Sequence, residues 1–205
     1  MPLVTAHVSM SLDGFVAGPD QTLEQPLGVG GLELHRWHLG DPDNDVDRAM
    51  TERILAPHGA YVMGRNMYGP VRGEWDSFAD GEMWRGWWGD EPPYHAPVFV
   101  LTHYPHESVE MAGGTTFHFV TDFDEAMERA IEAAGEETVT IAGGASAVRQ
   151  GFAAGLIDQI LINHAPVVLG GGESIFADLP DLRLRPVEVH SSPLATHIVY
   201  DVDRS

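Results

Sequence analysis

Short runs of β-forming residues alternate with helical patterns along most of this 205-residue chain. When a helix connects two strands, the second strand can pair in parallel with the first. The connecting helices then cover the faces of the sheet. Runs rich in Val, Ile, Thr and aromatic residues predict strands at Leu3–Val8, Ala60–Met63, Val98–Thr102, Thr116–Val120, Thr138–Ala142, Gln159–Val168, Arg185–His190 and Thr196–Val202. We therefore expect an α/β fold with a largely parallel sheet.

Three further segments have the spacing of amphipathic helices. They are Asp43–Leu55, Phe123–Ala134, which Gly135 can end, and Ser146–Ala154, which Gly155 follows. Only a short turn around residues 191–195 separates the last two strands, so we expect an antiparallel hairpin at the C-terminal end. The sequence has no repeat and no long linker, which predicts a single domain over residues 1–205.

Acidic residues outnumber basic ones by 31 to 11, which gives a formal net charge of −20, and every basic residue is an arginine. Such a surface repels nucleic acid and anionic membranes, so both are poor partner candidates. A site for an anionic small molecule needs arginine, backbone N–H groups or a helix N-terminus. The absence of cysteine excludes disulfides and thiol catalysis. Because no signal segment and no long apolar stretch is visible, we expect a soluble cytoplasmic protein.

Two glycine motifs follow predicted strands and open helical segments. In VMGRNMY (62–68) the glycine lets another molecule approach the backbone, and Arg65 supplies a charge-assisted donor for phosphate. In IAGGASAVRQ (141–150) two glycines precede a helix whose free N–H groups and partial positive charge favour a pyrophosphate. Each motif alone is also consistent with a helix entry or a tight turn, and the second lacks the full GxGxxG pattern.

Two polar segments lie at the ends of other predicted strands. Thr102 and His103 end the run VFVLTH (98–103), on the side where open α/β sheets bind ligands. In HVSMSLDGFVAG (7–18), Asp13 can hold a donor group of a heterocycle or relay a proton, and Phe15 can stack on a ring. Solvated strand ends and a plain Asp-Gly turn are the structural alternatives. A backbone crossing explains the triple glycine at 170–172 as well as a ligand does.

Other suggestive patterns carry less weight. The pairs His35/His38 and His103/His106 have a spacing compatible with metal ligands on a helix, but no third ligand stands in a matching motif, so we predict no metal site. The tryptophan-rich segment 75–88 can be a lid, a subunit contact or a packed loop. The sequence has neither Gly-x-Ser-x-Gly nor a P-loop, which argues against a triad hydrolase and an NTP phosphatase.

The chain resembles the dihydrofolate-reductase-like family in five segments taken in order: SLDGFVAG (11–18), VMGRNMY (62–68), VFVLTH (98–103), IAGGASAVRQ (141–150) and APVVLGGGESIF (165–176). Within that family it is most similar to the C-terminal reductase domain of the bacterial bifunctional deaminase-reductase of riboflavin biosynthesis and its stand-alone relatives. The resemblance extends from about Leu3 to Val202. It implies three layers, α/β/α, around a central, mostly parallel mixed sheet, with NADPH across the C-terminal edge and frequent homodimers.

The resemblance also implies which residues contact the cofactor. Carried over by motif, these are Ala17 and Gly18 beside the nicotinamide, Gly64, Arg65, Asn66 and Met67 in the Gly-Arg motif, Thr102 and His103 beside the 2′-phosphate, and Gly143, Gly144, Ala145 and Ser146 in the pyrophosphate loop. Arginine and bare N–H groups are what a chain of this charge needs to hold a polyanion.

Two positions depart from the riboflavin-pathway reductases, which typically have lysine where this chain has His7 and glutamate where it has Ala142. Both changes remove groups expected to hold the phosphoribosyl-pyrimidine substrate. We therefore expect an NADPH-dependent reductase that transfers a hydride to a small heterocycle, such as a pteridine or a ribosylaminopyrimidine. The alternatives are the riboflavin-pathway 5-amino-6-(5-phosphoribosylamino)uracil reductase itself and a non-catalytic nucleotide-binding relative.

Reduction of a C=N bond consumes a proton as well as a hydride, so an acid should face the substrate. Asp13 is the first candidate, and its alternative role is to cap the turn. Alternation along the strand places His7 on the same side, where it can hold the substrate or tune Asp13. The other predicted substrate contacts are Met10, Phe15 and Trp37, with Glu33 and His38 as second-line candidates for the acid.

Overall fold

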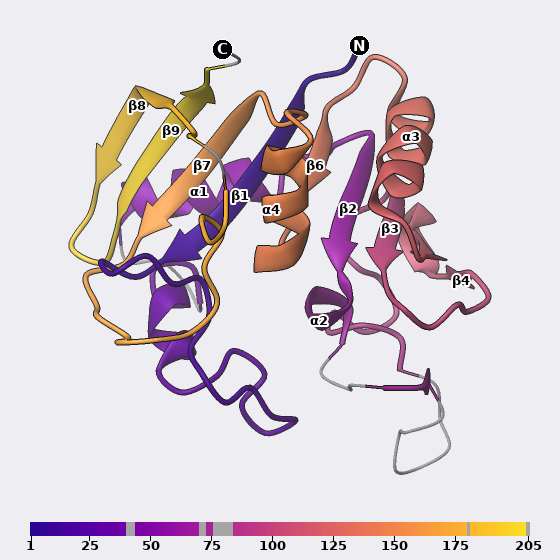
Figure 1. The fold of residues 1–205 in the computed structure, drawn as a ribbon, viewed down its shortest axis with the longest axis horizontal. Helices are drawn as coiled ribbons and strands as arrows, with labels where there is room; N and C mark the ends of the chain where they lie inside the picture. Colours follow the sequence, from indigo (N-terminus) through magenta and orange to yellow (C-terminus); the bar gives the residue numbers. More distant parts are fainter. Residues whose placement is uncertain (40–43, 70–72, 76–83, 180, 204–205) are drawn as a thin grey trace. The chain divides into compact units, whose positions relative to one another are not determined.

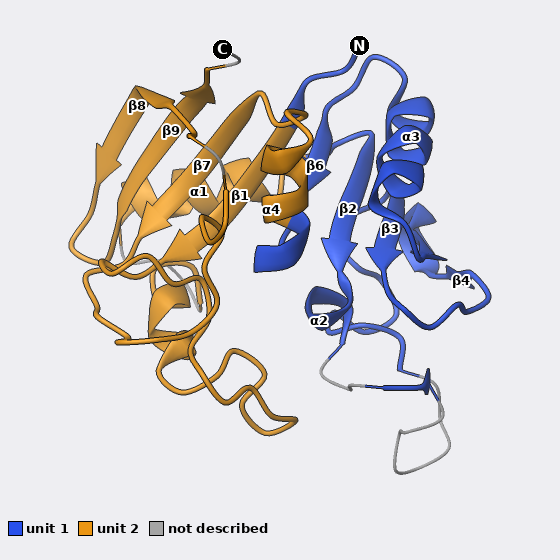
Figure 2. Ribbon diagram, in the orientation of Figure 1, with its two compact units in different colours: residues 1–4, 57–147 blue, residues 5–56, 148–205 orange. Residues whose placement is uncertain are grey.

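The computed structural model describes residues 1–39, 44–69, 73–75, 84–179 and 181–203 (Figure 1). The chain divides into two compact units, and each is made from two separate stretches of the sequence (Figure 2). Unit 1 contains residues 1–4 and 57–147, and unit 2 contains residues 5–56 and 148–205. Each unit has its own cluster of buried apolar side chains.

Unit 1 is built on parallel strands. Its strands are β2 (Ala60–Gly64), β3 (Pro97–Leu101), β4 (Val109–Glu110), β5 (Thr116–Val120) and β6 (Val139–Ile141), in the order β4-β5-β3-β2-β6. The pairs β2–β3, β2–β6 and β3–β5 are parallel, whereas the two-residue β4 runs antiparallel to β5. The connections hold α2 (Arg65–Tyr68), a 3-10 turn (Ala112–Gly114), α3 (Phe123–Ala134) and the start of α4 (Ala145–Ala153).

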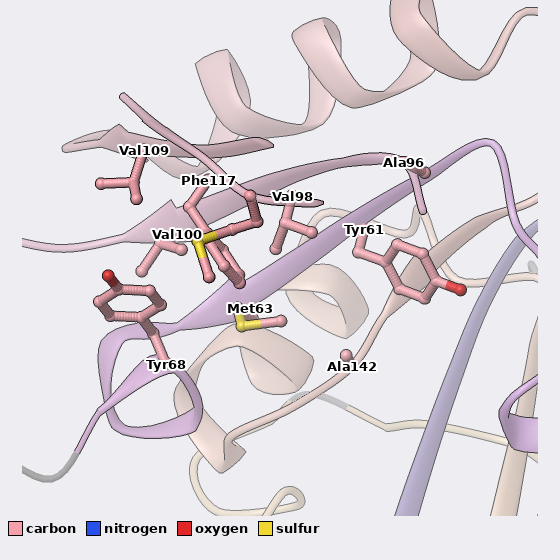
Figure 3. Close-up of a cluster of buried hydrophobic side chains, with 10 residues drawn as sticks. Tyr61, Met63, Tyr68, Ala96, Val98, Val100, Val109, Phe117 and Ala142 are labelled. Atoms are coloured by element: carbon pink, nitrogen blue, oxygen red, sulfur yellow. The ribbon is translucent and has the colours of Figure 1, made fainter. Parts of the chain in front are cut away.

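Apolar side chains line both faces of these strands. Tyr61 and Met63 point to one face of β2 and Val62 to the other, as the pleat of a strand requires. On the first face, Tyr61 and Met63 join a buried cluster with Tyr68 and Phe117 (Figure 3). Helix α3 packs on β2 and β3 with the apolar stripe that the sequence predicts. Because both faces of these strands are covered, their amino-acid sequences are nearly continuous apolar runs and do not alternate with polar residues.

Unit 2 combines one parallel strand pair with an antiparallel hairpin. Strand β1 (Val4–Met10) pairs in parallel with β7 (Gln159–His164), and β9 (Thr196–Val202) lies antiparallel beside β7. Strand β8 (Leu184–Ser191) pairs with β9 and forms the edge, so the predicted C-terminal hairpin is confirmed. The unit also contains the 3-10 helix η1 (Gly31–His35), α1 (Asp45–Ile54) and the later part of α4.

A row of buried polar side chains crosses the strands of unit 2. The register puts Ser9 of β1 opposite Asn163 of β7, and Asn163 opposite His197 of β9. The Ser9 hydroxyl accepts a hydrogen bond from Trp37 Nε1 at 2.9 Å. The ring nitrogens of His197 lie 2.9 Å from Asp47 Oδ1 and 2.7 Å from Asn163 Oδ1. These bonds tie α1 and the segment before it to three adjacent strands.

The predicted fold class, an α/β fold with a central, mostly parallel sheet, is confirmed, but several element ends differ. Strand β7 stops at His164 instead of Val168, because Pro166 has no N–H for the ladder and the chain turns there. Strand β1 continues to Met10, since its last residues stay paired with β7. Helix α1 begins at Asp45 because the Asn44 side chain caps it, and the predicted start at residue 43 lies outside the described residues. Within the described ranges, no helix is long and apolar enough to cross a bilayer.

Candidate functional site

Three loops of unit 1 leave the sheet from the same ends of neighbouring parallel strands. Arg65 follows β2, Thr102 follows β3 and Gly143 lies just after β6. The β2–β3 and β2–β6 registers align these strand ends, so the loops emerge at one edge. In open α/β sheets this carboxyl edge is where ligands bind. The structure thus brings together three of the motifs found in the sequence.

The two glycine motifs touch through their backbones. The N–H of Gly64 donates to the carbonyl of Gly143 at 2.8 Å. A Cβ added at Gly64 would lie 3.5 Å from the Gly144 nitrogen, and one added at Gly143 would lie 3.5 Å from the Met67 sulfur. A Cβ at Gly144, in contrast, would meet no atom within 4 Å. Helix α4 begins at the next residue, so bare backbone and the first N–H groups of a helix share one loop.

Arg65 lies against two aromatic rings. Its guanidinium carbon is 3.8 Å from the ring centroid of Trp75 and 5.2 Å from that of Tyr104. The two aromatic residues are themselves joined, because Trp75 Nε1 donates to the Tyr104 carbonyl at 2.7 Å. The sequence motif indicates the arginine but not these neighbours. Trp75 lies in a segment without a distinctive spacing, and Tyr104 simply follows His103.

The other predicted cofactor residues of unit 1 differ in exposure. Thr102 is buried, and its Oγ1 accepts a hydrogen bond from the Tyr104 N–H at 3.1 Å. This hydroxyl therefore holds the turn after β3, which favours His103 over Thr102 as a group that a ligand can reach. Ala145 is buried at the start of α4. The exposed residues of this set are Asn66, Met67, His103 and Ser146.

In unit 2, Asp13 binds the backbone of the triple-glycine loop. Its carboxylate accepts hydrogen bonds from the N–H groups of Leu169, at 3.1 Å, and Gly170, at 2.7 Å. The Ser11 hydroxyl and these two N–H groups lower the pKa of Asp13 to about 2. Strand β1 ends before Asp13, so the alternation argument that paired Asp13 with His7 is wrong. The contacts match the turn-capping alternative.

Ala17 and Gly18 lie where backbones cross. A Cβ at Gly18 would sit 2.0 Å from the Val29 carbonyl oxygen, and one at Gly172 would sit 2.0 Å from the Ala17 oxygen. Ala17 also forms an isolated antiparallel bridge with Glu173. Main chains approach so closely at residues 18 and 172 that only glycine fits there. The triple glycine at 170–172 therefore contributes to a backbone crossing.

Two residues predicted to contact a substrate belong to the core instead. Trp37 is 1% exposed and Met10 is 3% exposed, so neither can reach a ligand in this structure. The Trp37 ring packs edge-on against His197, at 4.8 Å between centroids, and its N–H is bound by Ser9. A large aromatic ring whose one polar atom has a partner is well suited to a core. Phe15 is half-buried, and its contact with a substrate stays a prediction.

Histidines gather beside β1. His35 Nδ1 lies 3.0 Å from His38 Nε2. Burial, with the nearby imidazoles of His38 and His7, lowers the pKa of His35 to about 4, and burial also lowers that of His38. Among the described residues, no group of three potential ligands has the arrangement of a metal site. Glu33 is exposed and pairs with Arg36 at 3.0 Å.

The tryptophan-rich segment is only partly described, because residues 76–83 lie outside the described residues. Trp84 is packed into unit 1, since its Nε1 donates to the Tyr68 carbonyl at 2.7 Å and the Tyr68 hydroxyl donates to the Trp84 carbonyl at 2.6 Å. Trp87 and Trp88 are exposed, by 43% and 56%. Trp84 therefore belongs to a packed loop, one of the three alternatives. For Trp87 and Trp88, a role in a lid or a subunit contact stays a prediction.

Several solved structures resemble this chain. A protein assigned to riboflavin biosynthesis in Shewanella sp. PV-4 has a TM-score of 0.64 and 22% identity, over 98% of this chain and 99% of that one. A pyrimidine reductase-like protein from Corynebacterium diphtheriae has a TM-score of 0.60 and 18% identity, over 100% and 93% of the two chains. At these identities the likeness concerns the fold.

A longer structure contains the same fold as one part. The Thermotoga maritima diaminohydroxyphosphoribosylaminopyrimidine deaminase/5-amino-6-(5-phosphoribosylamino)uracil reductase matches with a TM-score of 0.58 and 16% identity. That match covers 98% of this chain but only 57% of the other. No curated protein sequence matches. The model of the RibD C-terminal domain family, however, matches residues 2–200, and the chain therefore belongs to that family.

Proposed function

We propose that this protein is an NADPH-dependent reductase that transfers a hydride to a small heterocyclic substrate. Its family of reductase domains implies an oxidoreductase. The observation that carries the finer proposal is the meeting of three motifs at the carboxyl edge of β2, β3 and β6 in unit 1. The first motif supplies an arginine and the second a histidine at a strand end. The third supplies two glycines and the N-terminus of α4.

The residues of unit 1 fit a dinucleotide with several phosphates. Arg65 offers a cation in a chain of charge −20. The open space beside Gly144 lets a pyrophosphate approach the backbone and the first N–H groups of α4. We assign the 2′-phosphate to Arg65 and His103. The cofactor, when bound, supplies the hydride, and the protein orients it and excludes water from the reacting atoms.

The substrate is proposed as a pteridine or a ribosylaminopyrimidine. The runner-up, the riboflavin-pathway 5-amino-6-(5-phosphoribosylamino)uracil reductase, is supported by the family and by the reductase named in the Thermotoga maritima structure. His7 and Ala142, which replace the lysine and glutamate typical of pathway enzymes, favour a different heterocycle. A cofactor-binding relative without turnover is the remaining alternative. Screening pteridines and the riboflavin intermediate for NADPH oxidation separates the three.

Cofactor choice gives the first test. The purified protein should bind NADPH more tightly than NADH, and Arg65→Ala should weaken NADPH by roughly tenfold or more and NADH much less, since a charge-assisted bond contributes about 1.5–3 kcal/mol. Isothermal titration calorimetry measures both constants. Failure of the wild type to bind either cofactor at millimolar concentration would overturn the proposed function. If Arg65→Ala weakened the affinity for NADPH and NADH equally, Arg65 would not bind the 2′-phosphate.

The proposal that Asp13 supplies the proton competes with its lowered pKa, which favours the ionised carboxylate, and one variant decides between the two. Asp13→Asn keeps the size of the side chain but can no longer release a proton. If Asp13 supplies the proton, turnover of an identified substrate should fall by roughly tenfold to a hundredfold or more, the usual contribution of a general acid. An unchanged rate from pH 5 to 9, in a variant that still binds NADPH, would leave Asp13 with its contacts to Leu169 and Gly170 alone.

We also propose a homodimer, formed through the late strands of unit 2, and a cytoplasmic location. Strand β8 supports the first point, since Arg185–Ser191 are exposed and Val189 is 60% exposed. Large exposed apolar side chains on an edge strand suit burial against a second copy. Light scattering should give twice the 22.3 kDa of one chain. A mass of one chain at micromolar concentration would refute the dimer, and fractionation of the source cells tests the location.

A further inference from the structure

We propose that Trp75 and Tyr104 are positioning residues that hold Arg65 for a ligand's phosphate and so set the preference for NADPH over NADH. This inference rests on the proposed function and names a determinant of its specificity. Both aromatic residues belong to unit 1, as Arg65 does, and neither is part of the glycine motifs.

The contact between Arg65 and Trp75 is close. The guanidinium carbon lies over the Trp75 ring, 3.8 Å from its centroid, which is within the range of a strong cation–π interaction. Tyr104 adds a second ring at 5.2 Å. Long arginine side chains have many rotamers, and holding one of them in place before a ligand arrives lowers the entropy that binding must overcome.

Trp75 is itself fixed from several sides. Its Nε1 donates to the Tyr104 carbonyl at 2.7 Å. Its ring makes edge contacts with Phe119, His106 and Tyr68, with centroid distances of 4.8, 5.4 and 5.9 Å. A ring held by one hydrogen bond and three other rings can act as a rigid support.

Aromatic support suits an arginine that must bind an anion. A ring attracts the cation through its quadrupole and carries no formal negative charge, so the contact places Arg65 without cancelling its charge. A guanidinium resting on a ring keeps its N–H donors in the plane of the rim, the geometry in which two of them can bind one phosphate. Because Nη1 and Nη2 of Arg65 are buried in this structure, a phosphate must displace neighbouring side chains to reach them. Because the 2′-phosphate distinguishes NADPH from NADH, the quality of this support should appear in the preference between the two.

The test uses 2′,5′-ADP and 5′-AMP, which differ by the 2′-phosphate and need no turnover. Isothermal titration calorimetry should show that Trp75→Leu weakens 2′,5′-ADP by about fivefold to tenfold and 5′-AMP by less than about twofold. Trp75→Phe keeps a ring and should retain most of the affinity. Tyr104→Leu should lose about twofold to threefold for 2′,5′-ADP, because its ring lies farther from Arg65. Trp88→Leu, the same change at an exposed tryptophan, is the matched control.

The outcomes separate this inference from the proposed function. If the wild type binds 2′,5′-ADP no more tightly than 5′-AMP, and Arg65→Ala does the same, then Arg65 does not bind the 2′-phosphate and that part of the proposed function is wrong. If Arg65→Ala abolishes the preference for 2′,5′-ADP while Trp75→Leu and Tyr104→Leu keep it, only the positioning role is overturned. Equal weakening of both nucleotides by Trp75→Leu, or tighter binding of both, also overturns that role. Circular dichroism confirms that each variant is folded, and Tyr104→Leu keeps the inference testable if Trp75→Leu does not fold.

Discussion

Replacing Asp47 by alanine should lower the free energy of unfolding by about 1–3 kcal/mol, the usual cost of leaving a buried polar group without its hydrogen-bond partner. Asp47 and His197 are both 0% exposed, and the Asp47 carboxylate lies 2.9 Å from the imidazole. The amide of Asn163 donates to the Val8 carbonyl at 3.1 Å, so its oxygen faces the other ring nitrogen of His197. Both ring nitrogens of His197 therefore have a buried oxygen as partner. Without Asp47, one of these nitrogens would be buried without its hydrogen-bond partner.

Urea denaturation at pH 7 measures this loss. Asp45→Ala provides the matched control, because Asp45 is on the same helix, is 97% exposed and pairs with Arg48 only at the surface. It should cost less than about 1 kcal/mol. If Asp47→Ala were as mild as Asp45→Ala, the buried pair would not stabilise the attachment of α1 to β7 and β9 in unit 2.

Acid should destabilise the protein through His35. The pKa of this buried side chain is lowered from 6.5 to about 4. In the unfolded chain His35 takes up a proton below about pH 6.5, whereas in the folded chain it does so only below about pH 4. The unfolded state therefore binds more protons in this window, and stability falls as the pH drops through it. The difference corresponds to on the order of 3 kcal/mol lost at pH 4.

Unfolding curves in urea between pH 4.5 and 7.5 test this slope. Burial also lowers the pKa values of His38, His58, His118 and His164, so the total dependence should be steeper than His35 alone predicts. His35→Gln should flatten the acid side of the curve, and His103→Gln, at an exposed position, should not. An acid slope that His35→Gln leaves unchanged would contradict the assignment.

The sequence was informative where local chemistry decides the structure. The apolar run before Gly64 predicted a buried strand, and the apolar stripe of Phe123–Ala134 predicted the helix that covers it, because both depend on short-range periodicity. Parallel pairing brings strand ends to one edge, but the strand order that places the Gly64, Thr102 and Gly143 loops beside one another is seen only in the structure.

Contacts between distant residues were not predictable in this way. Trp37 looks like a ligand-stacking residue until Ser9 is seen to bind its N–H and His197 to pack on its ring. Asp13 looks like an acid until the chain returns with two N–H groups at residues 169 and 170. No local spacing links Arg65 to Trp75 and Tyr104. In each case the role depends on a partner brought in by the tertiary fold.

The exposed edge strand β8 has a consequence for handling the protein. An open strand edge can pair with other chains and start aggregation. Here Pro186 lacks an N–H, and the register shifts between Pro186 and Glu188, so the ladder is interrupted midway. Val187 and Val189 nevertheless stay 39% and 60% exposed. If the proposed dimer covers β8, a variant that cannot associate there should precipitate at concentrations where its fold is still intact.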